Sequence, residues 1–287
     1  MPHAPSSAAR SVAALALATA LLAASCRSTG SDESATLPEP LLPHMSLVVE
    51  SMVLGETRIV HVWTPPSYDA DASASLPVLY MPDGGVEEDF VHVTNDMDSL
   101  IRQGIVRPTI VVGLENTERR RDMTGPTRFD EDREIAPRVG GSQAFRDFWR
   151  TELIPTVERR FRTNGERAIV GESLAGLFVL ETFFLEPDLF DTWIALSPSL
   201  WWNGGALVEG AEALLGASPS LNETVYFATA SDDDVDGAGG KLAAAFENAD
   251  LASTRWIYEA CGNLTHATIY RERSPDVFRA LFGADER

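Results

Sequence analysis

The chain is poor in basic residues, and lysine is almost absent from it. Its 23 basic residues include a single lysine, Lys241, and they stand against 43 acidic residues, so the formal net charge is −20 at pH 7. A surface of this sign repels the phosphates of nucleic acids. The composition therefore excludes nucleic acid as the expected partner, although it says little about a small-molecule substrate.

Cysteine is also scarce, since only Cys26 and Cys261 occur in 287 residues. The first of them follows a short apolar run, residues 12–24, with Arg10 ahead of it. As a helix this run would span about 20 Å, which is too short for a bilayer core of about 30 Å. The pattern favours a cleaved signal peptide over a membrane-spanning helix.

The end of that segment reads Leu22-Ala23-Ala24-Ser25-Cys26, which is typical of a lipidation site in bacterial export signals. We therefore expect residues 1–25 to be a lipoprotein-type signal peptide, Cys26 to carry the lipid, and the protein to lie in the periplasm or at the outer membrane. Residues 26–45 are rich in serine and proline and predict a flexible tether. Ordinary cleavage with a free Cys26 remains open. A lipidated Cys26 would leave Cys261 without a disulfide partner.

Periodicity predicts one catalytic domain over residues 46–287. Residues 46–54 and 57–64 alternate apolar and polar side chains, as a β-hairpin does. Apolar strand-like runs then alternate with helical patterns, and the runs are residues 76–81, 108–114, 167–170, 192–196, 224–230 and 255–261. Residues 98–103, 143–161 and 274–282 predict helices. The expected fold is α/β, with a single mostly parallel, doubly wound sheet and antiparallel N-terminal strands.

The most informative stretch is Gly171-Glu172-Ser173-Leu174-Ala175-Gly176, between an apolar strand and an apolar helix. It follows the G-x-S-x-G pattern of a nucleophile elbow, except that Ala175 occupies the last glycine position. A serine at such a bend presents its hydroxyl at the carboxyl end of the sheet, where a base can activate it. Ser173 is therefore the predicted nucleophile.

A histidine and an acidic run follow the serine in the order nucleophile, acid, base. Of the five histidines only His266 follows the last predicted strand, and we interpret it as a loop residue and the general base. The acid candidates are Asp232, Asp233, Asp234 and Asp236, all after the penultimate strand. Asp232 is preferred because it lies nearest the strand end. A Ser–His dyad without a required carboxylate remains open.

Other residues at the same edge are candidates for binding the substrate. The oxyanion needs preorganised amide donors, which we expect from Leu174 together with Gly84 or Gly85. Arg121, Trp201 and Trp202 flank the same face and are candidate substrate contacts, with ion pairing and a structural lid as the alternatives. Glu172 is a candidate for tuning the site or contacting the substrate, with simple exposure beside the cleft as the alternative.

From about Ser46 onward the chain resembles esterases of the esterase D and enterochelin-esterase group. It is most similar to the branch that contains periplasmic siderophore esterases. The resemblance is carried by residues 76–85, 119–124, 148–155, 171–178 and 197–202 and by the His266 segment. It implies an α/β-hydrolase fold and serine esterase activity on Ser173 and His266, with no cofactor and no metal. Glu172 stands where histidine is usual, Ala175 replaces a glycine, and Gly125 is inserted before Pro126.

The combined prediction is an exported, lipid-anchored serine esterase that acts on a small-molecule ester through an acyl-enzyme. Two alternatives use the same residues differently. One is an acyltransferase with an acceptor in the cell envelope, and the other is a hydrolase-fold lipoprotein that only binds. The identity of the ester and the oligomeric state are not predicted.

Overall fold

The computed structural model describes residues 39–217, 222–232, 234, 237–249, 251 and 253–284. The predicted signal peptide, Cys26 and the first part of the tether lie outside these residues, and so do Asp233 and Asp236. Where the chain is described, no helix has both the length and the apolar character needed to cross a membrane.

Eight strands form one sheet in the order β1-β2-β4-β3-β5-β6-β7-β8. The strands are β1 (Met45–Ser51), β2 (Glu56–Trp63), β3 (Leu76–Met81), β4 (Ile110–Leu114), β5 (Thr163–Glu172), β6 (Thr192–Leu196), β7 (Thr224–Ala230) and β8 (Arg255–Cys261). Strand β2 pairs antiparallel with β1 and with β4, and every later pair is parallel. The predicted α/β class, with antiparallel strands at the N-terminal side, is confirmed.

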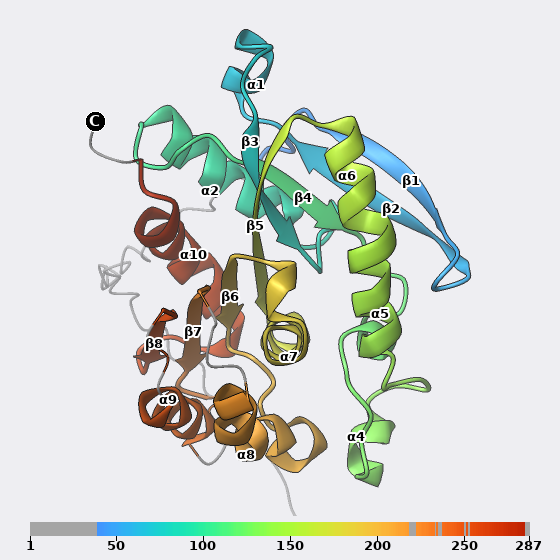
Figure 1. Ribbon diagram of the computed structural model, residues 1–287, viewed down its shortest axis with the longest axis vertical. Coiled ribbons are helices and arrows are strands. Elements are labelled where there is room, and N and C mark those ends of the chain that lie inside the picture. Colours follow the sequence, from blue (N-terminus) through green and yellow to red (C-terminus); the bar gives the residue numbers. More distant parts are fainter. Residues whose placement is uncertain are drawn as a thin grey trace, which may run out of the picture. The chain divides into compact units, whose positions relative to one another are not determined.

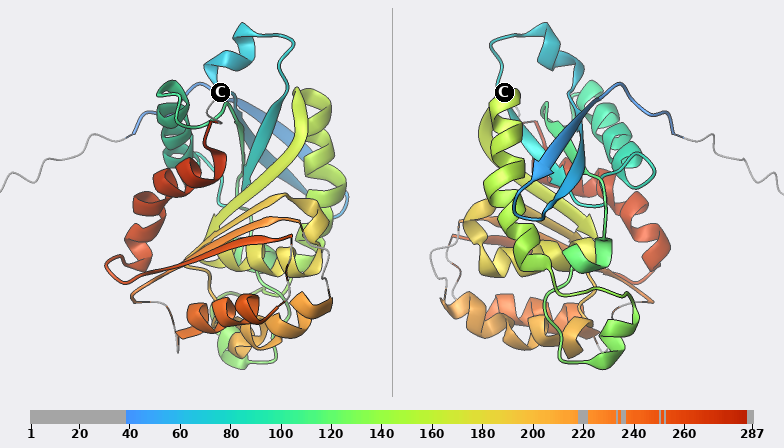
Figure 2. Two further views of the ribbon diagram at one scale, coloured as in Figure 1. Left: turned by 60° about the vertical axis from the view of Figure 1, so that its left-hand side comes forward. Right: turned by 90° about the vertical axis from the view of Figure 1, so that its right-hand side faces the viewer.

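Helices cover both faces of the sheet (Figures 1 and 2). They are α1 (Pro66–Ala70), α2 (Phe90–Arg102), α3 (Arg119–Asp122), α4 (Asp130–Glu134), α5 (Ser142–Phe148), the π-helix η1 (Trp149–Leu153), α6 (Ile154–Arg160), α7 (Leu174–Leu185), the 3-10 turn η2 (Pro187–Leu189), α8 (Trp202–Ala217), α9 (Ala238–Asn248) and α10 (His266–Phe282). A buried apolar cluster lies on each face of the sheet. Helices α2 and α10 contribute to one cluster, and α5 to α9 contribute to the other. The parallel strands are therefore buried on both sides, which explains their continuous apolar sequences.

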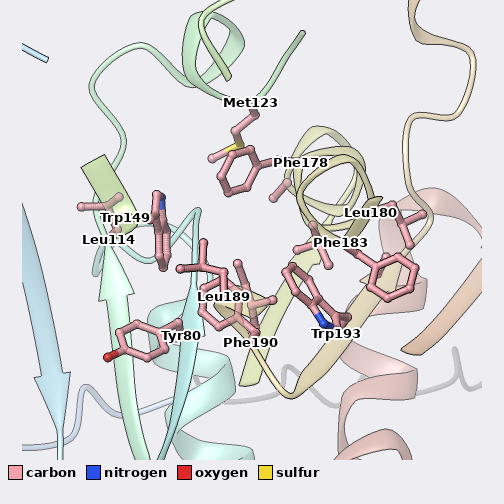
Figure 3. Packing of buried hydrophobic residues seen from close by; sticks show 14 of the residues in the cluster. Tyr80, Leu114, Met123, Trp149, Phe178, Leu180, Phe183, Leu189, Phe190 and Trp193 are labelled. Carbon is pink, nitrogen blue, oxygen red and sulfur yellow. The ribbon is translucent and has the colours of Figure 1, made fainter. Parts of the chain in front are cut away.

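Aromatic side chains fill the larger cluster, which lies on the α7 face (Figure 3). Trp149 meets Tyr80 and Phe190 with their ring centroids 5.9 and 6.1 Å apart, and Phe190 meets Trp193 at 5.1 Å. These edge-to-face pairs add to the stabilisation that comes from apolar burial. Phe178 and Phe183 of α7 contact Trp149 and Trp193, with ring centroids 6.2 and 5.7 Å apart, and so pack α7 against the sheet.

The C-terminal helix begins earlier than the sequence predicts. Its first residue is His266 rather than Ser274, because Pro275 lies inside α10 and does not start it. Thr265 and Thr268 form a capping box at its N-terminus. His266 therefore stands in the first helical turn, with a more rigid backbone than a loop would give it.

The folded unit also begins earlier than residue 46. The Asn95 side chain donates a hydrogen bond to the Pro40 carbonyl, and the His44 ring packs on His61 and Phe90. The segment from Glu39 is therefore part of the sheet domain, and these residues of the predicted tether pack against it.

Candidate active site

Ser173 occupies the sharp bend between β5 and α7 (Figure 1), with φ 61° and ψ −122°. An L-residue is strained in this region, and such strain is concentrated at functional sites. The bend needs a glycine at position 171, because a Cβ there would lie 2.7 Å from the Ala175 carbonyl oxygen and 2.9 Å from the Ala175 Cβ. With no side chain on Gly171, the methyl group of Ala175 fits, and the departure from the G-x-S-x-G pattern leaves the elbow geometry in place.

The same backbone device recurs at the carboxyl ends of the neighbouring strands. Asp83 follows β3 with φ 56°, and Ser197 follows β6 with φ 41°. Since β3, β5 and β6 are adjacent and parallel, these two bends flank Ser173 at one edge of the sheet. Three turns with a strained backbone, at Asp83, Ser173 and Ser197, therefore lie side by side at this edge of the sheet.

His266 reaches the elbow from the other end of the chain. Its ring Nε2 lies 3.2 Å from Oε1 of Glu172, the residue immediately before the serine. Asp232 Oδ1 accepts a hydrogen bond of 2.8 Å from the main-chain amide of His266. Asp232 thus anchors the first turn of α10 to the end of β7, and among the described residues the carboxylate of Glu172 lies beside the ring.

Another of the predicted acid candidates has a local structural task. Asp234 Oδ1 accepts the Gly239 amide at 2.7 Å, in the first turn of α9. This arrangement stabilises the start of a helix and does not place its carboxylate on His266 in any contact of the described residues.

Glu172 is the titratable group whose environment is least ordinary in this region. Its side chain is 16% exposed, and burial raises its pKa from 4.5 to about 7. The positive charges of His266 and Arg119 oppose that rise, whereas the carboxylates of Asp89 and Asp83 add to it. A carboxylic acid with such a pKa exchanges its proton near neutral pH, which is typical of functional sites.

Arg119 ties two of the strand ends together. Its guanidinium donates to both carboxylate oxygens of Asp83 at 2.7 Å, and more weakly to the Glu172 carbonyl at 3.4 Å. Asn116 donates to Asp83 as well, at 2.5 Å. The bidentate pair holds the β3 turn against the elbow, and it commits two of the five N–H donors of Arg119 to Asp83.

Arg121 is the predicted substrate contact in the run 119–121, but its side chain points away from the cleft. Arg121 is directed to Glu56 and Asp122, to which it donates at 2.7 and 2.6 Å, and it does not line the cleft beside Ser173. Successive helical residues point about 100° apart, so the members of the run in α3 face different surroundings. Arg119 and Arg120 are the two that reach the cleft, and the sequence pattern alone carries no signal that separates them from Arg121.

A cleft of about 300 Å³ joins the serine and the histidine. Its lining residues are Arg119, Arg120, Ile135, Ser173, Leu174, Ser199, Trp201 and His266. Trp201, a predicted substrate contact, is 38% exposed and forms part of the wall. Trp202 is buried instead, and its indole nitrogen donates to the Gly125 carbonyl at 3.0 Å, so it supports the wall from behind.

The three amides predicted to bind the oxyanion, those of Leu174, Gly84 and Gly85, differ in whether they already donate a hydrogen bond. Leu174 is the first residue of α7, so its amide is one of the first-turn groups that have no acceptor within the helix. The amide of Gly84 donates to the Leu114 carbonyl at 2.9 Å, and that of Gly85 donates to Glu88 Oε2 at 2.7 Å. Both glycine amides are therefore engaged. Gly84 is required for packing, because a Cβ there would lie 2.3 Å from the Gly113 Cα.

Across the described part of the chain, no group of three or more His, Cys, Asp or Glu side chains has a geometry suited to a metal ion. The described cleft brings together a serine, a histidine and the first amides of a helix, with the Glu172 carboxyl group beside the histidine.

Comparison with known proteins defines the class. The model of the Putative esterase family matches residues 51–267, so the chain belongs to this family. Its sheet and flanking helices are those of the α/β-hydrolase esterases.

Two of the relatives are named as siderophore-related esterases. The chain is 29% identical over 186 residues to the ferri-bacillibactin esterase BesA of Bacillus subtilis, an alignment that covers 59% of this chain and 64% of that protein. It is 37% identical over 97 residues to the siderophore triacetylfusarinine C esterase of Aspergillus fumigatus, covering 33% and 31%. In both cases the alignment spans less than two thirds of the relative.

Solved structures of other proteins share the fold of this chain. An IroE-like serine hydrolase from Shewanella oneidensis has a TM-score of 0.74 and 25% identity, and the match covers 84% of this chain and 80% of that one. The enterobactin esterase FES from Shigella flexneri has a TM-score of 0.62 at 19% identity, covering 85% and 60%, which shows a shared fold.

Proposed function

We propose that this protein is a serine esterase, which hydrolyses carboxylic esters through an acyl-enzyme on Ser173 with His266 as the general base. The observation that carries the proposal is the cleft in which Ser173, at a strained strand-to-helix bend, shares a wall with His266. Membership of the esterase family supports ester hydrolysis as the reaction.

In the proposed mechanism Ser173 Oγ attacks the ester carbonyl carbon while the His266 imidazole accepts its proton. The carbonyl oxygen becomes an oxyanion that accepts a hydrogen bond from the Leu174 amide. Collapse of this intermediate breaks the bond to the alcohol, which takes the proton from His266 as it leaves. Water, activated by the same imidazole, then attacks the acyl-serine and releases the acid.

For the substrate we propose an anionic ester of the siderophore class. The named activities of the relatives support this choice. So does Arg120, which is exposed in the cleft wall and forms no ion pair with any described carboxylate. A cation left unpaired in a chain of net charge −20 is suited to hold a negative substrate group.

Replacing Ser173 tests the proposal. We expect Ser173→Ala to lower kcat/KM for a p-nitrophenyl ester by at least ~10³-fold, because the nucleophile is lost. Ser199→Ala is the matched control, since Ser199 lines the same cleft, and its activity should stay within about tenfold of wild type. Retention of activity in Ser173→Ala would refute the mechanism. Product analysis with an added sugar acceptor separates hydrolysis from acyl transfer.

We also propose that the protein is exported and anchored by a lipid on Cys26. The sequence at residues 22–26 supports this, as does the apolar run before it. In cells given a labelled fatty acid, the wild-type chain should take up label and sediment with membranes, and Cys26→Ser should do neither. An unlabelled wild-type chain would contradict the anchor.

A further inference from the structure

One carboxyl group in the site has no part in the mechanism above. Glu172 is the last residue of β5, and the bend at Ser173 follows it directly. Its Oε1 lies 3.2 Å from Nε2 of His266, in a position that is largely shielded from solvent. The carboxylate and the serine hydroxyl are thus neighbours in the chain and share one histidine.

This ion-pair contact involves a nitrogen that a general base needs. A general base must place a ring nitrogen within hydrogen-bond distance of the proton that it accepts. The described partner of Nε2 is Glu172, although Ser173 and His266 line the same cleft. We propose that Glu172 is a positioning residue, which holds the His266 imidazole at Nε2 in the resting enzyme and must release it before Ser173 can be activated. This inference rests on the proposed function.

The charges around Glu172 explain why its contact with His266 depends on protonation. His266 on α10 and Arg119 on α3 favour its ionised form, whereas Asp83 and Asp89, which lie between β3 and α2, oppose it. Arg119 cannot neutralise Glu172 fully, because its guanidinium is engaged by Asp83. The charge of Glu172 is therefore balanced mainly by the histidine that it holds.

A buried hydroxyl adds to this polar pocket. Tyr270 lies one turn after His266 on α10 and is buried, and its hydroxyl has no hydrogen-bond partner among the described residues. Burial and the carboxylates of Asp89, Asp83 and Glu172 raise the pKa of Tyr270, so it stays neutral. Among the described residues, the cations that act on Glu172 are His266 and Arg119.

The ionised carboxylate has a definite effect on the base. An anion close to a ring nitrogen stabilises the imidazolium, and the Glu172 carboxylate lies 3.2 Å from Nε2, so removing its charge favours the free base. The two groups titrate as a pair, and the acid limb of kcat/KM reports the pair and not the histidine alone. Removing the charge should release the base at lower pH.

The test compares pH profiles of kcat/KM for a p-nitrophenyl ester between pH 5 and 9. We expect Glu172→Gln to move the acid limb about one unit lower, which gives about a fivefold gain one unit below the wild-type limb. Glu209→Gln removes the same charge from an exposed residue beside Trp201, and its limb should stay at the wild-type position. An unchanged limb in Glu172→Gln would overturn the inference.

A second measurement needs no variant of Glu172. In the wild-type protein, the ring proton resonance of His266, assigned by its loss in His266→Ala, should titrate with two inflections. A single inflection near the ordinary histidine pKa of about 6.5 would also overturn the inference. Either negative result leaves the proposed function intact as long as Ser173→Ala abolishes hydrolysis. Activity that survives Ser173→Ala would instead refute the proposed function itself.

Discussion

Two clusters of ionised side chains in this molecule contain a glutamate each, and the two glutamates behave in opposite ways. In the first cluster Glu56 meets Arg121 and Arg58, at 2.7 and 2.5 Å. The hydrogen bonds from Arg121, reinforced by the charge of Arg58, lower the pKa of Glu56 to about 2. In the second cluster burial raises the pKa of Glu172 to about 7.

The difference lies in how many guanidinium groups each carboxylate receives. The first cluster adds Asp122, which is buried and shares both of its arginines with Glu56. In the second, the one guanidinium is bound to Asp83, and Glu172 keeps a titratable histidine as its partner. A carboxylate paired with two arginines belongs to a cluster whose charges stay fixed, whereas a carboxylate paired with a histidine belongs to a cluster that responds to protons.

The largest expected effect comes from breaking the first cluster. Arg58 is fully buried, binds Asp122 at 2.5 Å and lies over the Phe145 ring. Arg58→Met should lower the free energy of unfolding by about 4 kcal/mol, because the buried carboxylate loses a partner. Denaturant unfolding measures this. The control is Arg102→Gln, whose solvent-exposed pair with Asp98 should change the free energy of unfolding little. Equal small losses in both variants would show that the cluster is not structural.

A smaller effect, of opposite sign in the two clusters, comes from removing each glutamate. The pKa of Glu172 is higher in the folded protein than unfolded, so the stability that it contributes is complete below pH 4.5 and is lost as pH rises to about 7. Relative to wild type, Glu172→Gln should therefore gain about 2 kcal/mol of stability between pH 4.5 and pH 8.

Glu56→Gln is the matched control for that measurement. The pKa of Glu56 is lowered, so its contribution is present above pH 4.5 and is lost as pH falls to about 2. This variant should be less stable than wild type by about 2 kcal/mol at pH 7 and should approach it on acidification. Thermal unfolding across pH reports both signs. Parallel curves for the two variants would remove the distinction between the clusters.

Local sequence patterns anticipated much of this molecule. The turn around Gly171 and Gly176, and the position of His266 after the last strand, follow from composition and spacing that a reader can see. The sequence pattern predicts the last helix only from Ser274, because a proline such as Pro275 is typical of a helix start, whereas the helix begins at His266. Periodicity also could not show that residues 39–45 pack on the sheet, since that segment has little pattern of its own.

The sequence by itself determined the α/β class, the order of the strands along the chain and the serine bend. Each of these depends on residues that are close together in the chain, through turn chemistry and side-chain period. The tertiary structure alone decided that Arg119 and Arg120 rather than Arg121 reach the cleft, and that Glu172 meets His266. Those contacts join β5 and α3 to elements far away in the sequence. They follow from the strand order β3-β5-β6-β7-β8 and from the direction in which each helix residue points, and no local pattern encodes either.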